Sequence, residues 1–132
     1  MIAADTNILV RAIVGDDPAQ TEIARRWMSV HQVGGIYIDH IVLVELVWVL
    51  RARYVQPRAE IVRVIELLLG TGGIVVPEEH LVRNALATYR AGRGDFSDHL
   101  IKERAHARGF SPLATFDESL HGLRGFAKLR GA

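Results

Sequence analysis

The sequence predicts an α/β fold with a mostly parallel sheet in one domain covering residues 1–132. Short apolar segments alternate with segments of helical period along the whole chain. A chain of 132 residues also fits one domain with a single core. The expected strands, four to five in the sheet, come from Ile2–Ala4, Gly35–Ile38, Gly73–Val76, Leu113–Thr115 and Ala127–Leu129. The expected helices are Thr6–Val14, Pro18–His31, His40–Tyr54, Arg58–Gly70, Glu78–Ala91, Phe96–Arg108 and a short Glu118–Gly122.

Turn and cap residues support these divisions in order along the chain. Asp16-Asp17-Pro18 reads as a turn with proline in the first turn of the second helix. The stretch from Gly70 to Gly73 reads as a helix stop before the third strand. The segment Ile41–Leu50 is apolar on every side except at Glu45, so we expect its helix to be largely buried. Further on, Asp95 begins a capping pattern that starts the helix at Phe96.

Composition excludes several classes of protein. With 49% hydrophobic and 23% charged residues, the chain has the composition of a compact soluble protein. Glu45 divides the longest apolar segment, which is too short to cross a membrane, and we expect a cytoplasmic protein with no signal peptide. The absence of cysteine excludes disulfides, thiolate zinc sites and cysteine nucleophiles. A net charge of +1 argues against strong non-specific binding to nucleic acid, so any such role must use local clusters.

Four acidic residues interrupt or follow apolar segments where carboxylates are costly. They are Asp5, Glu45, Asp98 and Asp117. Because their mutual repulsion would need a divalent cation to offset it, the pattern predicts a metal site built by the fold. An all-oxygen set suits Mg²⁺, with Mn²⁺ as a second option, and that chemistry points to phosphate esters. Asp5 and Asp117 each follow a predicted strand, which is where open α/β sheets bind ligands.

Each acid also has a structural interpretation. Glu45 could pair with Arg51, and Asp95 is as well explained as a helix cap as a ligand. The neighbouring Thr6, Asn7 and Thr115 could orient a carboxylate, hold a water molecule or cap a helix. The six histidines lack zinc-ligand spacing, and the chain has no phosphate-binding glycine loop.

Together these motifs resemble the PIN-domain ribonucleases, and among them the VapC-type toxins of toxin–antitoxin pairs. The resemblance rests on four segments in order, namely residues 1–11, 44–50, 95–101 and 113–117. It implies a three-layer α/β/α sandwich with Asp5, Glu45, Asp98 and Asp117 as the catalytic, metal-binding set. The resemblance implies Asp95 as an additional acid, and Thr115 matches the hydroxyl residue that often precedes the last acid of the set.

The resemblance further implies a Mg²⁺-dependent endoribonuclease that forms a homodimer and is inhibited by a VapB-type antitoxin, which also supplies any contact with promoter DNA. Parts of Ile41–Leu50 and Ile61–Leu69 are expected to form the dimer surface and a groove for an antitoxin helix. One alternative is a non-catalytic acidic module that binds a basic peptide. A phosphatase of the haloacid-dehalogenase type is disfavoured, because Asn7 stands where that class needs a second acid. The RNA that is cut, the number of metal ions and the antitoxin's identity stay open.

Overall fold

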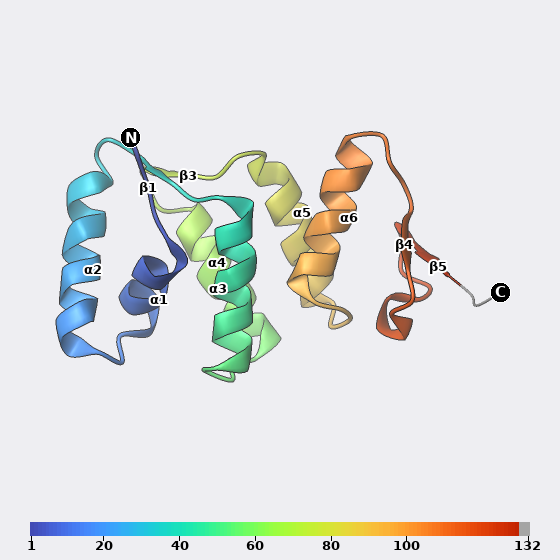
Figure 1. Cartoon of the computed structure of the whole chain (residues 1–132), viewed down its shortest axis with the longest axis horizontal. Helices are drawn as coiled ribbons and strands as arrows, with labels where there is room; N and C mark the ends of the chain where they lie inside the picture. Colours follow the sequence, from blue (N-terminus) through green and yellow to red (C-terminus); the bar gives the residue numbers. More distant parts are fainter. Residues whose placement is uncertain (130–132) are drawn as a thin grey trace. The chain divides into compact units, whose positions relative to one another are not determined.

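A computed structural model describes residues 1–129, which fall into two compact units (Figure 1). The N-terminal unit covers Met1–Glu79, and the C-terminal unit begins at His80. The last three residues of the predicted 1–132 domain lie outside the described residues. Each unit is described separately below.

The N-terminal unit contains a parallel three-stranded sheet in the order β1-β2-β3. Ile36 on the central strand is paired with Ile2 on one side and Ile74 on the other, and it is fully buried. Parallel strands need a crossover between them, which the four helices of this unit provide. The elements in order are β1 (Ile2–Ala3), α1 (Thr6–Val14), α2 (Pro18–His31), β2 (Ile36–Tyr37), α3 (His40–Ala52), α4 (Arg58–Leu69) and β3 (Ile74–Val75).

Aspartate caps begin three of these helices. The Asp5 carboxylate accepts the backbone N–H of Thr6 at α1, and Asp17 accepts that of Gln20 at α2, where Pro18 is the first helical residue. The Asp39 carboxylate caps α3 in the same way. These bonds satisfy amide groups that have no partner inside the helix.

Helix α3 is only partly buried, and the expectation that it lies largely in the core is wrong. Its buried face carries Leu43, Leu46, Val47 and Leu50, at the 3–4-residue spacing of one helix side. Glu45 lies on the exposed side. Because the core needs only one face, Ile41 and Trp48 also stay 65% and 56% exposed.

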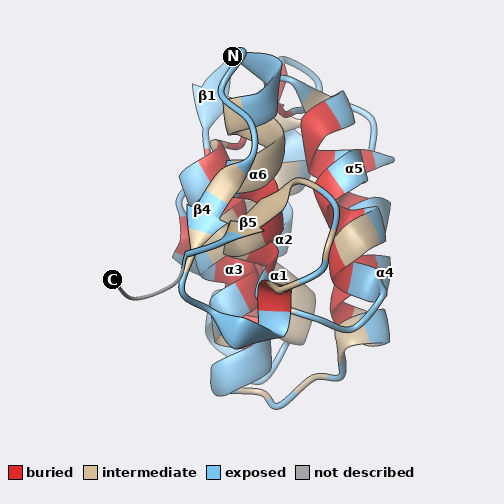
Figure 2. Cartoon of the chain, turned by 90° about the vertical axis from the view of Figure 1, so that its right-hand side faces the viewer, coloured by how far each residue is buried: buried red, intermediate tan, exposed pale blue. Residues whose placement is uncertain are grey.

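The C-terminal unit combines two packed helices with a small parallel sheet. Its elements are α5 (Glu79–Arg90, which starts at the unit boundary), α6 (Phe96–Ala107), β4 (Leu113–Thr115), the 3₁₀ turn η1 (Glu118–Leu120) and β5 (Phe126–Lys128). Strand β4 pairs in parallel with β5. The rings of Tyr89 and Phe96 meet edge to face at 6.0 Å between centroids, and both are buried. Buried and exposed positions alternate along α5, so one stripe of that helix forms the core (Figure 2).

The predicted helices and strands are confirmed with small shifts at their ends, but the strands form two sheets, of three and two strands, instead of the predicted single sheet of four to five. Helices α1 and α2 and strand β4 have the predicted bounds. Strand β5 starts one residue earlier than expected, at Phe126, because Gly125 ends the preceding turn with φ +90°. All three strand pairings are parallel, as expected. Among the helices of residues 1–129, none is both long and apolar enough to cross a membrane.

Candidate active site

Asp5 and Thr6 lie together at the end of β1, where the chain enters α1. The Asp5 carboxylate is 2.7 Å from the Thr6 backbone nitrogen and is exposed. Thr6 itself is 7% exposed. The neighbouring Asn7 is also exposed, and its side chain forms no hydrogen bond within residues 1–129. Asp5 thus caps a helix while keeping its carboxylate accessible to a ligand.

Glu45 is joined to this strand end by a hydrogen bond. The Thr6 hydroxyl donates to Glu45 Oε1 at 3.2 Å, although the two residues are 39 positions apart in sequence. The bond connects the start of α1 with the middle of α3. It also explains how an exposed glutamate on an otherwise apolar helix is held in one orientation.

Asp95 and Asp98 form a reciprocal capping box at the start of α6. The backbone N–H of Asp95 donates to Asp98 Oδ2 at 2.9 Å. The predicted capping role is therefore confirmed for this pair. A carboxylate can accept several hydrogen bonds or bind a cation with its second oxygen, so capping by Asp98 leaves ligation available.

Asp117 follows β4 and is held by the residues on either side of it. Its backbone N–H donates to the Thr115 hydroxyl at 3.0 Å, and its carboxylate accepts the hydroxyl and the N–H of Ser119 at 2.7 and 2.9 Å. These bonds from Ser119 lower the pKa of the Asp117 carboxyl group. The Asp117 carboxylate therefore stays ionised at a lower pH than an ordinary aspartate, and a carboxylate must be ionised to bind a metal ion.

Arg93 ties the start of α6 to the turn that follows Asp117. Its guanidinium donates to the carbonyl oxygens of Ser119 and His121 at 2.9 and 2.5 Å. The next residue, Gly94, has φ +75°, and a Cβ atom there would lie 2.3 Å from Leu120 Cδ2. Sequence reasoning missed this link, because its partners are 26 and 28 residues away from Arg93 and no local pattern predicts them.

Within each unit the predicted site residues share one region of the fold. Asp5, Thr6 and Glu45 are linked in the N-terminal unit, while Arg93 connects the surroundings of Asp98 and Asp117 in the C-terminal unit. Within residues 1–129, no three histidine, aspartate or glutamate side chains are grouped so as to hold a cation. The four-acid metal set thus stays a prediction. Its donors, carboxylate oxygens supported by hydroxyl groups, have the chemistry that a hard cation prefers.

Comparison with known proteins decides the family. The chain matches the PIN domain family over residues 2–125. It is a member of the PIN domain family. PIN domains are typically metal-dependent nucleases, and membership confirms the predicted PIN-like α/β sandwich class.

The chain is similar to a toxin-antitoxin complex from Klebsiella pneumoniae at 19% identity, with 96% of this chain and 94% of that chain covered and a TM-score of 0.34. No curated protein matches the chain. The PIN assignment accordingly rests on the family match, which spans all four acidic segments.

Proposed function

We propose that this PIN domain is a Mg²⁺-dependent endoribonuclease, with Mn²⁺ as an alternative metal, and that it acts as the toxin of a VapBC-type pair. The observation that carries the nuclease proposal is the family match over residues 2–125. The acids of the four motifs support it: four of the five are exposed, and Asp98 is half-buried. Accessible carboxylates with hydroxyl support suit metal binding better than a structural core role.

In this proposal hydroxyl groups orient two of the metal-binding acids. The metal-binding set is Asp5, Glu45, Asp98 and Asp117. A bound Mg²⁺ would polarise the phosphodiester and lower the pKa of an attacking water molecule. Thr6 restricts Glu45, and Ser119 restricts Asp117, by hydrogen bonds to their carboxylate oxygens. Fixing these oxygens beforehand reduces the cost of ordering them when the metal and the RNA bind.

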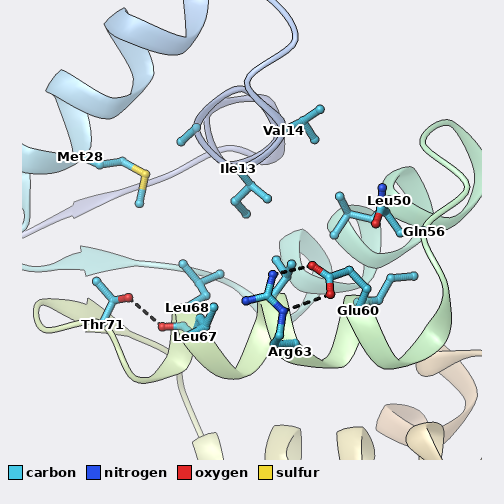
Figure 3. Close-up of a pocket in the computed structure, with 13 residues that line it drawn as sticks. Ile13, Val14, Met28, Leu50, Gln56, Glu60, Arg63, Leu67, Leu68 and Thr71 are labelled. Atoms are coloured by element: carbon cyan, nitrogen blue, oxygen red, sulfur yellow. Dashed lines mark hydrogen bonds and ion pairs between the residues drawn. The ribbon is translucent and has the colours of Figure 1, made fainter.

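A groove in the N-terminal unit supports the antitoxin proposal. It has a volume of about 520 Å³ and lies among α1, α2, α3 and α4 (Figure 3). Apolar side chains line most of it, including Ile13, Met28 and Leu67. At its edge, Arg63 forms an ion pair with Glu60 (Figure 3). An apolar groove of this kind fits the apolar face of an amphipathic helix, which we propose the antitoxin supplies.

Exposed apolar residues on α3 support the homodimer proposal. Ile41 and Trp48 are seven positions apart, so they lie on one side of the helix, with Val44 and Glu45 between them. Large apolar side chains grouped on one face often mark a contact with another protein. Size-exclusion chromatography with light scattering at low micromolar concentration should give twice the chain mass of 14.7 kDa. A single-chain mass for the wild type would contradict the dimer.

The decisive test of the nuclease uses partner-free protein and total cellular RNA. We expect discrete products with Mg²⁺ or Mn²⁺, none with EDTA, and none from the Asp5→Asn variant. Asparagine caps helices about as well as aspartate, so the variant should keep its fold. If folded wild-type protein binds metal yet cuts no RNA, the acidic binding module becomes the better interpretation.

A further inference from the structure

The C-terminal unit contains a second hollow, of about 610 Å³, that none of the functional assignments above uses. One side is the face of α6 that carries His99, Lys102 and His106. The opposite side is the turn into β5, with Arg124 and Phe126. The polar lining is rich in groups that can carry positive charge, unlike the mostly apolar groove of the N-terminal unit.

Lys102 is held in this hollow. Its side chain is only 12% exposed, and its ammonium group lies 3.3 Å from the Glu103 carboxylate and 5.6 Å from the centre of the Phe126 ring. The methylene chain passes directly over Gly125, where a Cβ atom would lie 2.5 Å from Lys102 Cδ. Packing of the methylene stem against Gly125 and Phe126 fixes the position of the ammonium group in the lining of the hollow.

Arg124 and His106 complete the positive lining. Both are exposed, and neither side chain has a hydrogen-bond or ion-pair partner among residues 1–129. With Glu103 offsetting Lys102, Arg124 leaves the hollow with one net positive charge. A guanidinium without a carboxylate partner is well suited to bind a phosphate through two parallel hydrogen bonds.

Lys102, in the lining of the hollow, lies one helical turn after Asp98, which is one of the proposed metal ligands. Asp98, Lys102 and His106 are four residues apart, so they follow one another on the same helix face at a rise of about 6 Å each. A chain of phosphates placed along this face would meet an acid that holds the metal, then a lysine, then a histidine. An acidic peptide could meet the same cations, but it has no group that needs to reach a metal bound at Asp98.

We propose that this hollow is a subsite for the sugar-phosphate backbone of single-stranded RNA, next to the phosphodiester that is cut. The proposal rests on the nuclease function proposed above. In it, Arg124 and His106 bind phosphates beside the scissile one, while the ion pair of Lys102 and Glu103 forms part of the lining. These contacts add affinity and direct the strand towards Asp98 without reading the base sequence.

Metal-free binding of a fluorescently labelled single-stranded RNA tests the subsite separately from cleavage. Fluorescence anisotropy in EDTA is measured for wild type, Arg124→Ala and Arg124→Glu over a series of KCl concentrations. Arg26→Ala is the control, since Arg26 is an exposed arginine on α2 in the other unit. We expect Arg124→Ala to bind roughly three- to tenfold more weakly at low salt, and the slope of log K against log salt to fall by about 0.7 for the lost phosphate contact. The charge reversal should weaken binding further, and the control should match wild type.

Two results would overturn the subsite. One is an Arg124→Ala affinity and salt slope equal to those of wild type, which would leave the nuclease proposal standing if the wild type still cuts RNA. The other is equal displacement of the RNA by an acidic peptide of the same length and charge, which would reassign the hollow to a protein partner. Conversely, failure of cleavage together with a reduced slope at Arg124 would remove the nuclease and keep the RNA path.

Discussion

Removing the hydrogen bond from Thr6 to Glu45 should separate the effect of that bond on the orientation of the Glu45 carboxylate from its effect on the stability of the protein. Thr6→Val keeps the shape of the side chain and removes only the hydroxyl that donates to Glu45 Oε1 at 3.2 Å. Thr6 is 7% exposed, but Glu45 is exposed and regains water when the bond is lost. The expected loss of stability is therefore about 1 kcal/mol, the value of an ordinary hydrogen bond, because water solvates the exposed carboxylate. For a chain of this length that is a fall in Tm of roughly 3–5 °C.

Cleavage should fall by more than this stability loss explains. At temperatures where both proteins are folded, a Glu45 carboxylate that is no longer held must be ordered when metal binds, and about 1 kcal/mol of that cost lowers the rate roughly fivefold. The assay is RNA cleavage across a Mg²⁺ titration, with Tm measured in parallel. Thr6→Ser is the matched control, because it keeps the hydroxyl and loses only a methyl group. Equal cleavage by Thr6→Val and wild type at limiting Mg²⁺, or equal defects in the two variants, would refute the reasoning.

Three further predictions follow from the same structure. Neutral variants of the metal-binding acids should lose cleavage, and full activity in two of them would break the proposed set: Asp5→Asn, Glu45→Gln, Asp98→Asn and Asp117→Asn. The Tm of the metal-free protein should stay the same or rise in the first three, since each relieves repulsion between like charges, whereas Asp117→Asn should lower it because the bonds from Ser119 favour the charged carboxylate. Ser119→Ala should raise the pKa of Asp117 towards its ordinary value, which carboxyl NMR can follow, and an unchanged titration would contradict the assignment. In the wild type, the stabilisation from this pair is present above the pKa of Asp117 in the unfolded chain and is lost as pH falls through the lowered pKa of the folded protein. Gly94→Ala should lower the free energy of unfolding in urea by roughly 2–4 kcal/mol, from backbone strain and the clash with Leu120. Gly92→Ala is the control, because Gly92 also has a positive φ but faces open space, and it should cost roughly 1–2 kcal/mol. Equal costs would show that the clash with Leu120 contributes nothing.

The two interpretations of the α6 acids do not exclude each other. The capping box uses Asp98 Oδ2, and Asp98 lies one helical turn before Lys102, which lines the hollow of the C-terminal unit. Capping fixes the carboxylate at the helix start, where the helix dipole favours negative charge. A ligand that is already ordered by a cap binds a cation at lower entropic cost.

Local sequence determined most of the secondary structure of this protein. Asp5, Asp17 and Asp39 precede helices that they cap, and Pro18 begins one, because capping and proline geometry depend on neighbours within a few residues. The short apolar segments before Asp5 and Asp117 similarly predicted β1 and β4, although the pairing of those strands depends on distant segments. The family resemblance also came from sequence, since the order of the four acidic segments is a property of the chain.

Tertiary packing decided what those residues can touch. The sequence of α3 is apolar on nearly every side, and only the surrounding core determined that Leu43 and Leu50 are buried while Glu45 and Trp48 face solvent. The bond from Thr6 to Glu45 and the fit of Lys102 over Gly125 join residues that are distant in sequence. Contacts of this kind are set by how helices and strands pack in space, so no local pattern encodes them.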